Sequence, residues 1–330
     1  MENEIYKIPD FHARVDLSAL QNSLNLVKSE IGKVIVGQEN MIDHLLAALL
    51  SNGHVLIEGV PGVAKTITAK LLAKAISVDF SRIQFTPDLM PSDILGTSIF
   101  NVKNSEFEFK QGPIFSNFIL IDEINRSPAK TQAALFEVME ERQITMDGTE
   151  YKMDLPFLVI ATQNPIEHEG TYRLPEAQLD RFLFKINVGY PNIDQEIMII
   201  KNQHENKLED KTDAVKAVLS AQDLQSYQNL VKDIIVEHNL LEYIAKIIVN
   251  TRENQFLYLG ASPRASLALL TASKAFAAIR GRDFVTPEDI KEASFAVLRH
   301  RVMVSPEKEM EGLTADEIIR QIMESIEIPR

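Results

Sequence analysis

The sequence lacks cysteine and tryptophan entirely, and it lacks any long apolar run. Without cysteine the chain can form no disulfide, no thiolate metal site and no cysteine nucleophile. Lys, Asp, Asn or Gly interrupts every hydrophobic stretch before it reaches the roughly 18 residues that a membrane-spanning helix needs. The basic-then-apolar order of a secretory signal is absent from the first ten residues, MENEIYKIPD. We therefore expect a cytoplasmic protein without membrane insertion.

Positive charge is the minority sign in this chain. Its 34 Lys and Arg residues face 47 Asp and Glu residues, which leaves a formal net charge of −13. Such an acidic chain disfavours broad binding to nucleic acid, so nucleic acid is not an expected partner. The 330 residues, 45% of them hydrophobic and 25% charged, have the composition of a soluble globular protein with about two domains of roughly 150 residues.

Short apolar strands alternate with helical patterns up to Pro191, and only helical patterns follow it. The run 118–121 is continuously apolar, which is typical of a strand buried on both faces of a parallel sheet. We therefore predict an α/β fold, an αβα sandwich with a mainly parallel five-stranded sheet over residues 1–191, and an all-helical domain over 192–330. The predicted strands are 54–58, 82–85, 118–121, 157–161 and 182–188.

A glycine-containing loop joins the first predicted strand to the next helix. Its two glycines permit unusual backbone angles, so that successive N–H groups can face an anion at the helix N-terminus. The general P-loop pattern has Gly before its Lys, where this chain has Ala. The alternative is a simple strand–helix turn with a solvated Lys. As a phosphate site, the loop would use Lys65 for the β- and γ-phosphates and Thr66 for Mg²⁺. The loop is Gly59-Val60-Pro61-Gly62-Val63-Ala64-Lys65-Thr66.

Two adjacent carboxylates follow the buried run that ends at Ile121. Parallel α/β sheets bind ligands at the carboxyl ends of their strands, which is where Asp122 and Glu123 lie. We predict that Asp122 holds the metal and that Glu123 orients or deprotonates the attacking water. The alternative is a pair of acids that merely stabilise the start of the following helix. Both motifs in this order predict a site for a nucleotide with Mg²⁺.

These residues resemble the AAA+ ATPases, and within them the MoxR family, over nearly the whole chain. That family also tolerates Ala before the Lys of the loop. Six segments in one order carry the resemblance, although any one alone would be weak. They are 36–39 (VGQE), 59–66, 121–126 (IDEINR), 161–165 (ATQNP), 174–182 (LPEAQLDRF) and 260–264 (GASPR).

The resemblance assigns roles to polar residues outside the two motifs. It implies that Asn164 is sensor 1, which bonds the γ-phosphate or the attacking water; without the other motifs it would be an ordinary loop residue before Pro. It implies that Arg181 is the arginine finger, which reaches a neighbouring subunit's nucleotide, rather than one half of a surface pair with Asp180. Arg173 is a second candidate for that role.

Three further residues take roles from the resemblance. Arg264 is implied to be sensor 2, at the start of a lid helix that closes over the nucleotide of its own subunit; the alternative is a helix-start Arg without a ligand. Lys65 and Arg264 of one subunit and Arg181 of the next would then converge on one triphosphate. Val36 and Gly37 would line the adenine pocket.

The resemblance also implies a biological role. It implies Mg²⁺-dependent ATP hydrolysis by a ring, with a hexamer as the expected size, which remodels or helps to assemble client protein complexes. Von Willebrand A-domain proteins on separate chains are one implied class of partner. The rival interpretations are the ATPase subunit of a metal-chelatase complex and a nucleotide-gated scaffold with little turnover. A DNA motor is disfavoured by the acidic balance.

Two insertions are predicted to contact the client or the central pore of the ATPase rather than the nucleotide. Residues 96–115 and the hairpin signal at 143–152, with Asp147-Gly148 as its turn, resemble inserts that point at a pore or a client in related ATPases. The alternative for the first insertion is that Ile99 and Phe100 pack onto the sheet. The sequence leaves the two interpretations open.

Overall fold

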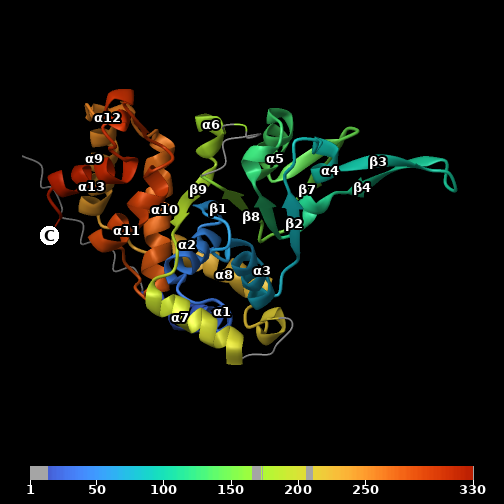
Figure 1. Cartoon of the computed structure of the whole chain (residues 1–330), viewed down its shortest axis with the longest axis horizontal. Coiled ribbons are helices and arrows are strands. Elements are labelled where there is room, and N and C mark those ends of the chain that lie inside the picture. The colour runs from blue at the N-terminus through green and yellow to red at the C-terminus, as the bar shows by residue number, and fades with distance from the viewer. Residues whose placement is uncertain (1–13, 166–171, 173, 206–210, 330) are drawn as a thin grey trace, which may run out of the picture.

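The central sheet of the protein has five strands, and every neighbouring pair is parallel. This computed structural model describes residues 14–165, 172, 174–205 and 211–329 (Figure 1). The predicted αβα sandwich is confirmed, with a sheet that is entirely rather than mainly parallel. In spatial order the strands are β2 (Phe80–Gln84), β5 (Phe118–Asp122), β8 (Leu158–Gln163), β1 (His54–Gly59) and β9 (Phe182–Val188).

The two faces of the sheet carry two separate hydrophobic clusters. Side chains alternate along each strand, so Val55 and Ile57 of β1 join one cluster while Leu56 between them joins the other. The first face is covered by α1 (Ser18–Gly32), α2 (Glu39–Leu50) and α3 (Lys65–Ile76), and the second by α4 (Pro91–Leu95) and α5 (Ala129–Glu141).

The second half of the chain is helical, as predicted, with one exception. A short antiparallel pair joins β10 (Leu257–Leu259) to β11 (Met303–Val304), so the prediction of no strand after Pro191 is wrong at this point. Strands of two and three residues are too short to give an alternating sequence pattern. The helices are α7 (Ile193–Glu205), α8 (Ala221–Lys232), α9 (His238–Glu253), α10 (Pro263–Ile279), α11 (Pro287–Leu298), α12 (Pro306–Met310) and α13 (Ala315–Ser325).

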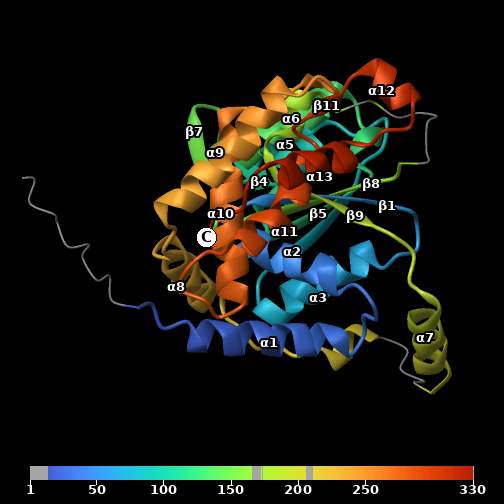
Figure 2. The same ribbon diagram turned by 90° about the vertical axis from the view of Figure 1, so that its left-hand side faces the viewer.

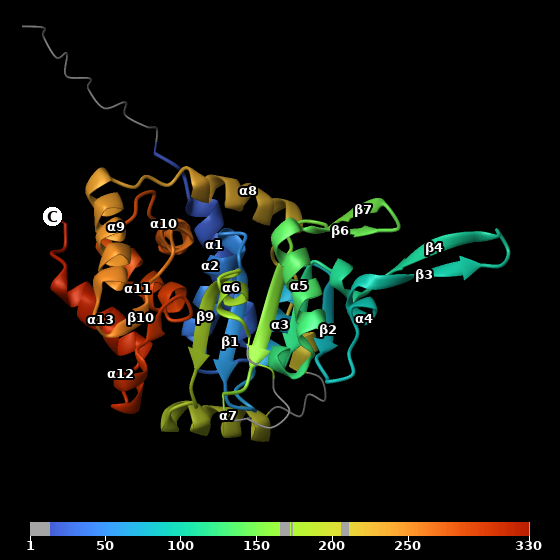
Figure 3. The same ribbon diagram turned by 90° about the horizontal axis from the view of Figure 1, so that it is seen from above.

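The lid helices share the first of the two hydrophobic clusters. Helix α10 packs against α2, and α11 packs against β9, so apolar side chains of both continue the core formed by α1, α2 and α3 (Figures 1 and 3). The lid therefore lies beside the β9 edge of the sheet. No helix in the described part of the chain is long and apolar enough to cross a membrane.

The two insertions both form β-hairpins. Strands β6 (Gln143–Met146) and β7 (Thr149–Lys152) meet at the predicted Asp147-Gly148 turn, whose positive φ angles of 51° and 79° suit a tight hairpin. Strands β3 (Gly96–Asn101) and β4 (Glu106–Gln111) extend away from the body (Figure 3). Phe100 is 52% exposed and Ile99 47%, so the alternative that they pack onto the sheet is wrong.

Four short helical elements complete the described chain. One is an α-helix between Leu174 and the last sheet strand, and three are 3₁₀ turns. They are α6 (Glu176–Leu179), η1 (Pro113–Phe115), η2 (Ile124–Arg126) and η3 (Lys211–Ala214). The two turns around β5 lead the chain into and out of the strand that ends at Asp122.

Candidate nucleotide-binding site

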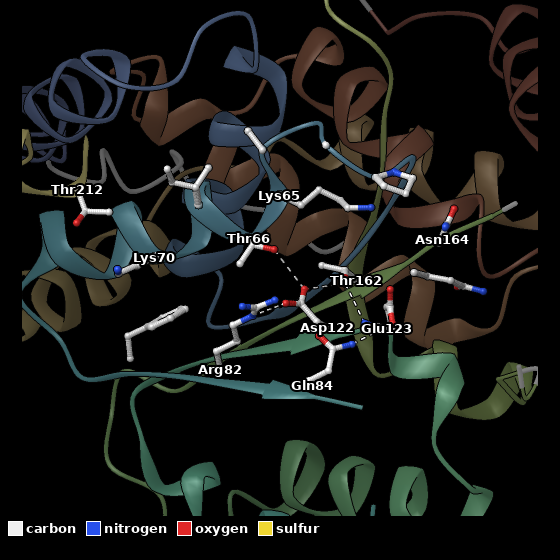
Figure 4. A pocket seen from close by; sticks show the side chains of 16 residues that line it. Lys65, Thr66, Lys70, Arg82, Gln84, Asp122, Glu123, Thr162, Asn164 and Thr212 are labelled. Atoms are coloured by element: carbon white, nitrogen blue, oxygen red, sulfur yellow. Dashed lines mark hydrogen bonds and ion pairs between the residues drawn. The ribbon is translucent and has the colours of Figure 1, made fainter. Parts of the chain in front are cut away.

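A cavity of about 780 Å³ opens at the carboxyl ends of the parallel strands. Its wall is formed by the loop between β1 and α3, the end of β2, the acids at the end of β5 and the residues that end and follow β8 (Figure 4). This volume lies within the range of small-molecule sites. Of the described residues after Pro191, Thr212 alone is among those that line it. In the described part of the chain the cavity therefore lies on the sheet domain and is not covered by helices α8 to α13, whereas the resemblance implied a lid that closes over it.

The phosphate-loop backbone has the conformation that its sequence pattern suggested. Gly62 has φ +87°. Ala64, which occupies the position before Lys65 where the general P-loop pattern has Gly, has φ 64° and ψ 19° and is therefore left-handed. An L-residue pays about 1–2 kcal/mol for this conformation. Gly59 is required for space, because a Cβ there would lie 2.7 Å from the carbonyl oxygen of Val188.

Five residues of the loop line the cavity. They are Pro61, Gly62, Ala64, Lys65 and Thr66. The amino group of Lys65 donates to the carbonyl of Gly59 at the start of the loop. Gly59, Val60 and Val63 shape the loop without lining the cavity, and the side chain of Val63 is buried in the core.

Asp122 lies at the centre of a polar network at the base of the cavity (Figure 4). Its Oδ1 accepts hydrogen bonds from Thr66 Oγ1 at 3.4 Å and from Thr162 Oγ1 at 3.1 Å. Its Oδ2 lies 2.6 Å from Nε of Arg82 on β2. Thr66 and Asp122 are therefore close enough to share one cation, and their hydroxyl and carboxylate oxygens are the ligands that Mg²⁺ prefers.

Glu123 has a strained backbone and a fixed side chain. Its φ of 58° is left-handed, and its N–H donates to Thr162 Oγ1 at 3.1 Å. Its Oε2 accepts from Gln84 Nε2 at 2.9 Å and lies 3.0 Å from Nε of Arg126. Strain of this kind persists where the surrounding structure determines the conformation, and it is common at functional sites.

Sequence reasoning missed four residues of this network. Thr162 is 3% exposed and connects the two acids through one hydroxyl. Arg82 and Gln84 did leave a signal, since they are polar residues on either side of Ile83 within the predicted strand 82–85. Arg126 had no signal of its own, because it is the last residue of the segment 121–126 and that segment does not show which side chain it contacts.

The structure brings Asn164 to the cavity but not the residues expected at the adenine. Asn164 is 8% exposed and lines the cavity beyond the end of β8. Val36 and Gly37 are not among the lining residues. Instead, the side chain of Gln195 on α7 lies directly against Gly37. The lining of the cavity therefore does not support a role for Val36 and Gly37 in binding adenine.

Arg181 and Arg264 lie together, away from the cavity. Both pair with Glu140 at the end of α5: Arg181 Nη2 is 2.6 Å from Oε2, and Arg264 Nη2 is 3.0 Å from Oε1. The hydrogen bond from Arg264 and then the charge of Arg181 lower the pKa of Glu140. The expected convergence of Arg264 with Lys65 in one subunit is therefore not seen. Arg173 lies outside the described residues.

The position of the two arginines follows from the direction of the sheet. Arg181 immediately precedes β9 and so lies at the amino ends of the parallel strands. The cavity lies at the carboxyl ends. The seven residues of β9 span about 23 Å at about 3.3 Å per residue, which no arginine side chain can bridge. We call these two sides the arginine edge, with Arg181, Arg264 and Glu140, and the cavity edge.

Comparison with known proteins agrees with this architecture. Residues 54–184 match the family described as "ATPase family associated with various cellular activities (AAA)", and residues 249–322 match its lid domain. The chaperone MoxR1 of Mycobacterium tuberculosis is 43% identical over 95% of this chain and 84% of its own length. The uncharacterized protein YeaC of Bacillus subtilis is 46% identical over 91% and 92%.

A solved structure gives the same result. The chain superposes on a candidate ATPase from Cytophaga hutchinsonii with a TM-score of 0.88 and 43% sequence identity, covering 95% of this chain and 97% of the other. Identity above 40% over nearly the full length of these proteins goes beyond a shared fold. The chain belongs to the MoxR family of AAA+ ATPases.

Proposed function

We propose that the protein hydrolyses ATP with Mg²⁺ at the cavity edge and works as a head-to-tail ring. The observation that carries the proposal is the network in which the hydroxyl of Thr162 bonds both Asp122 and the N–H of Glu123, opposite the phosphate loop. The hydroxyl of Thr162 thereby fixes the carboxylate of Asp122 and the backbone of Glu123, a preorganised arrangement of the kind that electrostatic catalysis uses.

Each residue at the cavity has a physical task in this proposal. The loop N–H groups at the start of α3 and the ammonium group of Lys65 bind the phosphates. Thr66 and Asp122 would hold Mg²⁺, whose positive charge would offset the charge that develops on the phosphate oxygens. Glu123 orients the attacking water and accepts its proton, and Asn164 holds the same water or the γ-phosphate in place. The carboxylate of Glu123 must leave Gln84 and Arg126 to do so.

The arginine edge supports a ring. A second copy that turns its arginine edge toward this cavity edge would bring both Arg181 and Arg264 to the nucleotide, and the same contact repeated head to tail closes a ring. Arginine supplied in trans is an established way to stabilise the charge of phosphoryl transfer. Unlike the expectation from the motifs, this arrangement takes both arginines from the neighbouring subunit. We propose a hexamer as the size of the ring.

We further propose that ATP turnover drives chaperone-like remodelling or assembly of client proteins. The relative MoxR1 is named as a chaperone, which supports such a role for this protein. The exposed aromatic pair Phe100 and Phe107, whose ring centroids lie 5.2 Å apart on the β3–β4 hairpin, offers an apolar contact for a client. In this proposal residues 1–191 form the nucleotide-binding domain and residues 192–330 form the lid domain. Its partners include von Willebrand A-domain proteins on separate chains. The protein acts in the cytoplasm.

The test of ATP hydrolysis is the substitution Glu123→Gln. Phosphate release should fall by at least about 100-fold while the affinity for a fluorescent ATP analogue stays within about twofold, because the amide can still occupy the space but cannot accept a proton. Glu137→Gln, an exposed acid on α5, is the matched control and should retain full turnover. Substantial hydrolysis by Glu123→Gln would remove Glu123 from its role. Absence of hydrolysis by the wild-type protein, with or without Mg²⁺, would favour the scaffold alternative.

A further inference from the structure

Helix α7 exposes apolar side chains to solvent, which is unusual for a helix that packs only against its own chain. None of its 13 residues is buried. Ile193, Ile197 and Ile200 recur at intervals of four and three residues and therefore share one face. They are 76%, 58% and 65% exposed. The half-buried residues, Gln195 and Asn202, are seven residues apart and share the opposite face. The helix thus turns Gln195, Asn202 and the less exposed Ile199 (36%) toward its own chain, and it turns Ile193, Ile197 and Ile200 toward solvent.

The helix begins at a well-formed N-terminus. The N–H of Asn192 donates to Gln195 Oε1, and the N–H of Gln195 donates to Asn192 Oδ1, both at 2.9 Å. This reciprocal pair stabilises the first turn. A helix of this length is nevertheless marginal in water unless an amphipathic face packs against something. Because no described part of the chain covers Ile193, Ile197 and Ile200, a second molecule would supply the surface that packs against them.

The location of α7 indicates which molecule that is. The helix follows the carboxyl end of β9, crosses in front of the carboxyl ends of β1 and β9, and lies with Gln195 against Gly37 (Figure 3). In a second view it stands apart from the other helices (Figure 2). It is therefore part of the cavity edge, which the proposed ring contact covers with the arginine edge of the next subunit.

The arginine edge carries a matching apolar surface. Leu267 is one turn beyond Arg264 on α10, so it shares the face of that arginine, and it is 66% exposed. Leu259 and Tyr258 on β10 are 48% and 74% exposed, and Leu259 lines one surface cavity together with Asp180, next to Arg181. Apolar side chains thus adjoin both arginines on the edge that would face α7.

From these two surfaces we infer that the outer face of α7 (Ile193, Ile197 and Ile200) packs against the lid surface around Leu267 of a second copy of this chain. The inference rests on the proposed ring. It identifies an apolar intersubunit contact beside the nucleotide. One docking event would then both cover the isoleucines of α7 and bring the two arginines to the cavity. The contact is heterologous, which is the type that a closed ring requires.

The chain's lack of cysteine makes a direct test possible. A variant with Ile197→Cys and Leu267→Cys, treated with a mild oxidant in the presence of ATPγS and Mg²⁺, should form disulfide-linked multimers in a ladder on a non-reducing gel. Each single substitution alone should give at most dimers. Ile197→Cys paired with Asn229→Cys, an exposed position on α8, is the matched control and should not form a ladder.

The second test measures assembly without a cross-link. Ile197→Glu should weaken oligomer formation at least tenfold in sedimentation velocity, and phosphate release should fall with it, while the affinity of the subunit for a fluorescent ATP analogue is unchanged. Gln203→Glu adds the same charge to α7 off the isoleucine face and should behave as wild type. Circular dichroism checks that each variant is folded.

The outcomes separate this contact from the function on which it rests. If the wild-type protein assembles and hydrolyses ATP but Ile197→Glu does so equally well and no ladder forms, α7 is not at the interface and the inference is wrong. If the wild-type protein neither assembles nor hydrolyses ATP, the proposed function fails first. Normal assembly of Ile197→Glu with loss of binding to anionic lipid vesicles would assign α7 to a membrane surface instead and would also overturn the inference.

Discussion

Removal of Arg181 and Arg264 from one subunit should be compensated by a neighbour that retains them. The double substitution Arg181→Ala/Arg264→Ala removes both guanidinium groups from the arginine edge but leaves the cavity intact. Turnover should fall by about 10³-fold or more, the usual effect of losing an arginine that stabilises phosphoryl transfer. Glu123→Gln has the reverse defect, with an intact arginine edge and an inactive cavity. Neither protein should hydrolyse ATP at an appreciable rate alone.

The structure sets the size of the compensation. Both arginines pair with Glu140 at the amino ends of the strands, so a neighbour must supply both together. In rings mixed at random in equal parts, half of the cavities keep Glu123 and half of those face a neighbour with both arginines. About one quarter of the sites are then complete, and the mixture should recover about a quarter of wild-type turnover, far above either variant.

The assay is phosphate release after the two variants are mixed before ATP is added. A matched experiment replaces the double variant with Arg264→Ala alone, which should recover to the same extent. If Arg264 acted within its own subunit, every cavity with an active Glu123 would lack it, and no recovery would occur. Recovery by Arg181→Ala but not by Arg264→Ala would therefore refute our placement of sensor 2 while leaving the arginine finger in place.

Four further predictions test the cavity and the stability of the fold. Thr162→Val should slow turnover about 10- to 100-fold at nearly unchanged nucleotide affinity, because it removes hydrogen bonds worth about 1.5–3 kcal/mol to the two acids; Thr162→Ser should retain turnover. Ala64→Gly should raise the free energy of unfolding in urea by about 1 kcal/mol, since glycine adopts the left-handed conformation without strain; an unchanged value would argue against strain at this position. Burial lowers the pKa of His54 from 6.5 to about 4, so between these values the unfolded chain binds a proton that the folded chain excludes. The free energy of unfolding of the wild-type protein should therefore fall by about 2 kcal/mol between pH 7 and pH 5 through this group. His54→Gln should not show this loss. Asp289→Ala should lower the free energy of unfolding by about 3–5 kcal/mol, because this fully buried carboxylate pairs with two lid arginines; a change below 1 kcal/mol would contradict that account.

Local sequence patterns predicted the parts of the structure that depend on local interactions. Apolar runs identified four of the five strands, because a strand buried in a parallel sheet needs apolar residues nearly throughout; the edge strand β2 has polar residues on either side of Ile83. The phosphate loop and the acid pair Asp122-Glu123 are each continuous segments, and parallel topology places the ends of their strands at one edge. The cavity could therefore be located from the sequence.

The positions that sequence reasoning missed depend on how distant segments dock. Arg264 is on the lid, and its place beside Arg181 follows from the packing of α10 on α2 and α11 on β9, which no short motif encodes. Thr162 follows the predicted strand 157–161, and nothing in the sequence showed that its hydroxyl connects both acids. The outward isoleucines of α7 fit an ordinary helix pattern, and only the structure shows which face the chain itself covers.

The central claim is that one catalytic site is built from two subunits. The most direct measurement is an experimental structure of Glu123→Gln with ATP and Mg²⁺. We predict a ring in which the γ-phosphate lies near Lys65 and Asn164 of one chain and within hydrogen-bonding distance of Arg181 and Arg264 of the next. A γ-phosphate contacted by Arg264 of its own chain, or an ATP-bound monomer with a fully enclosed site, would contradict the account.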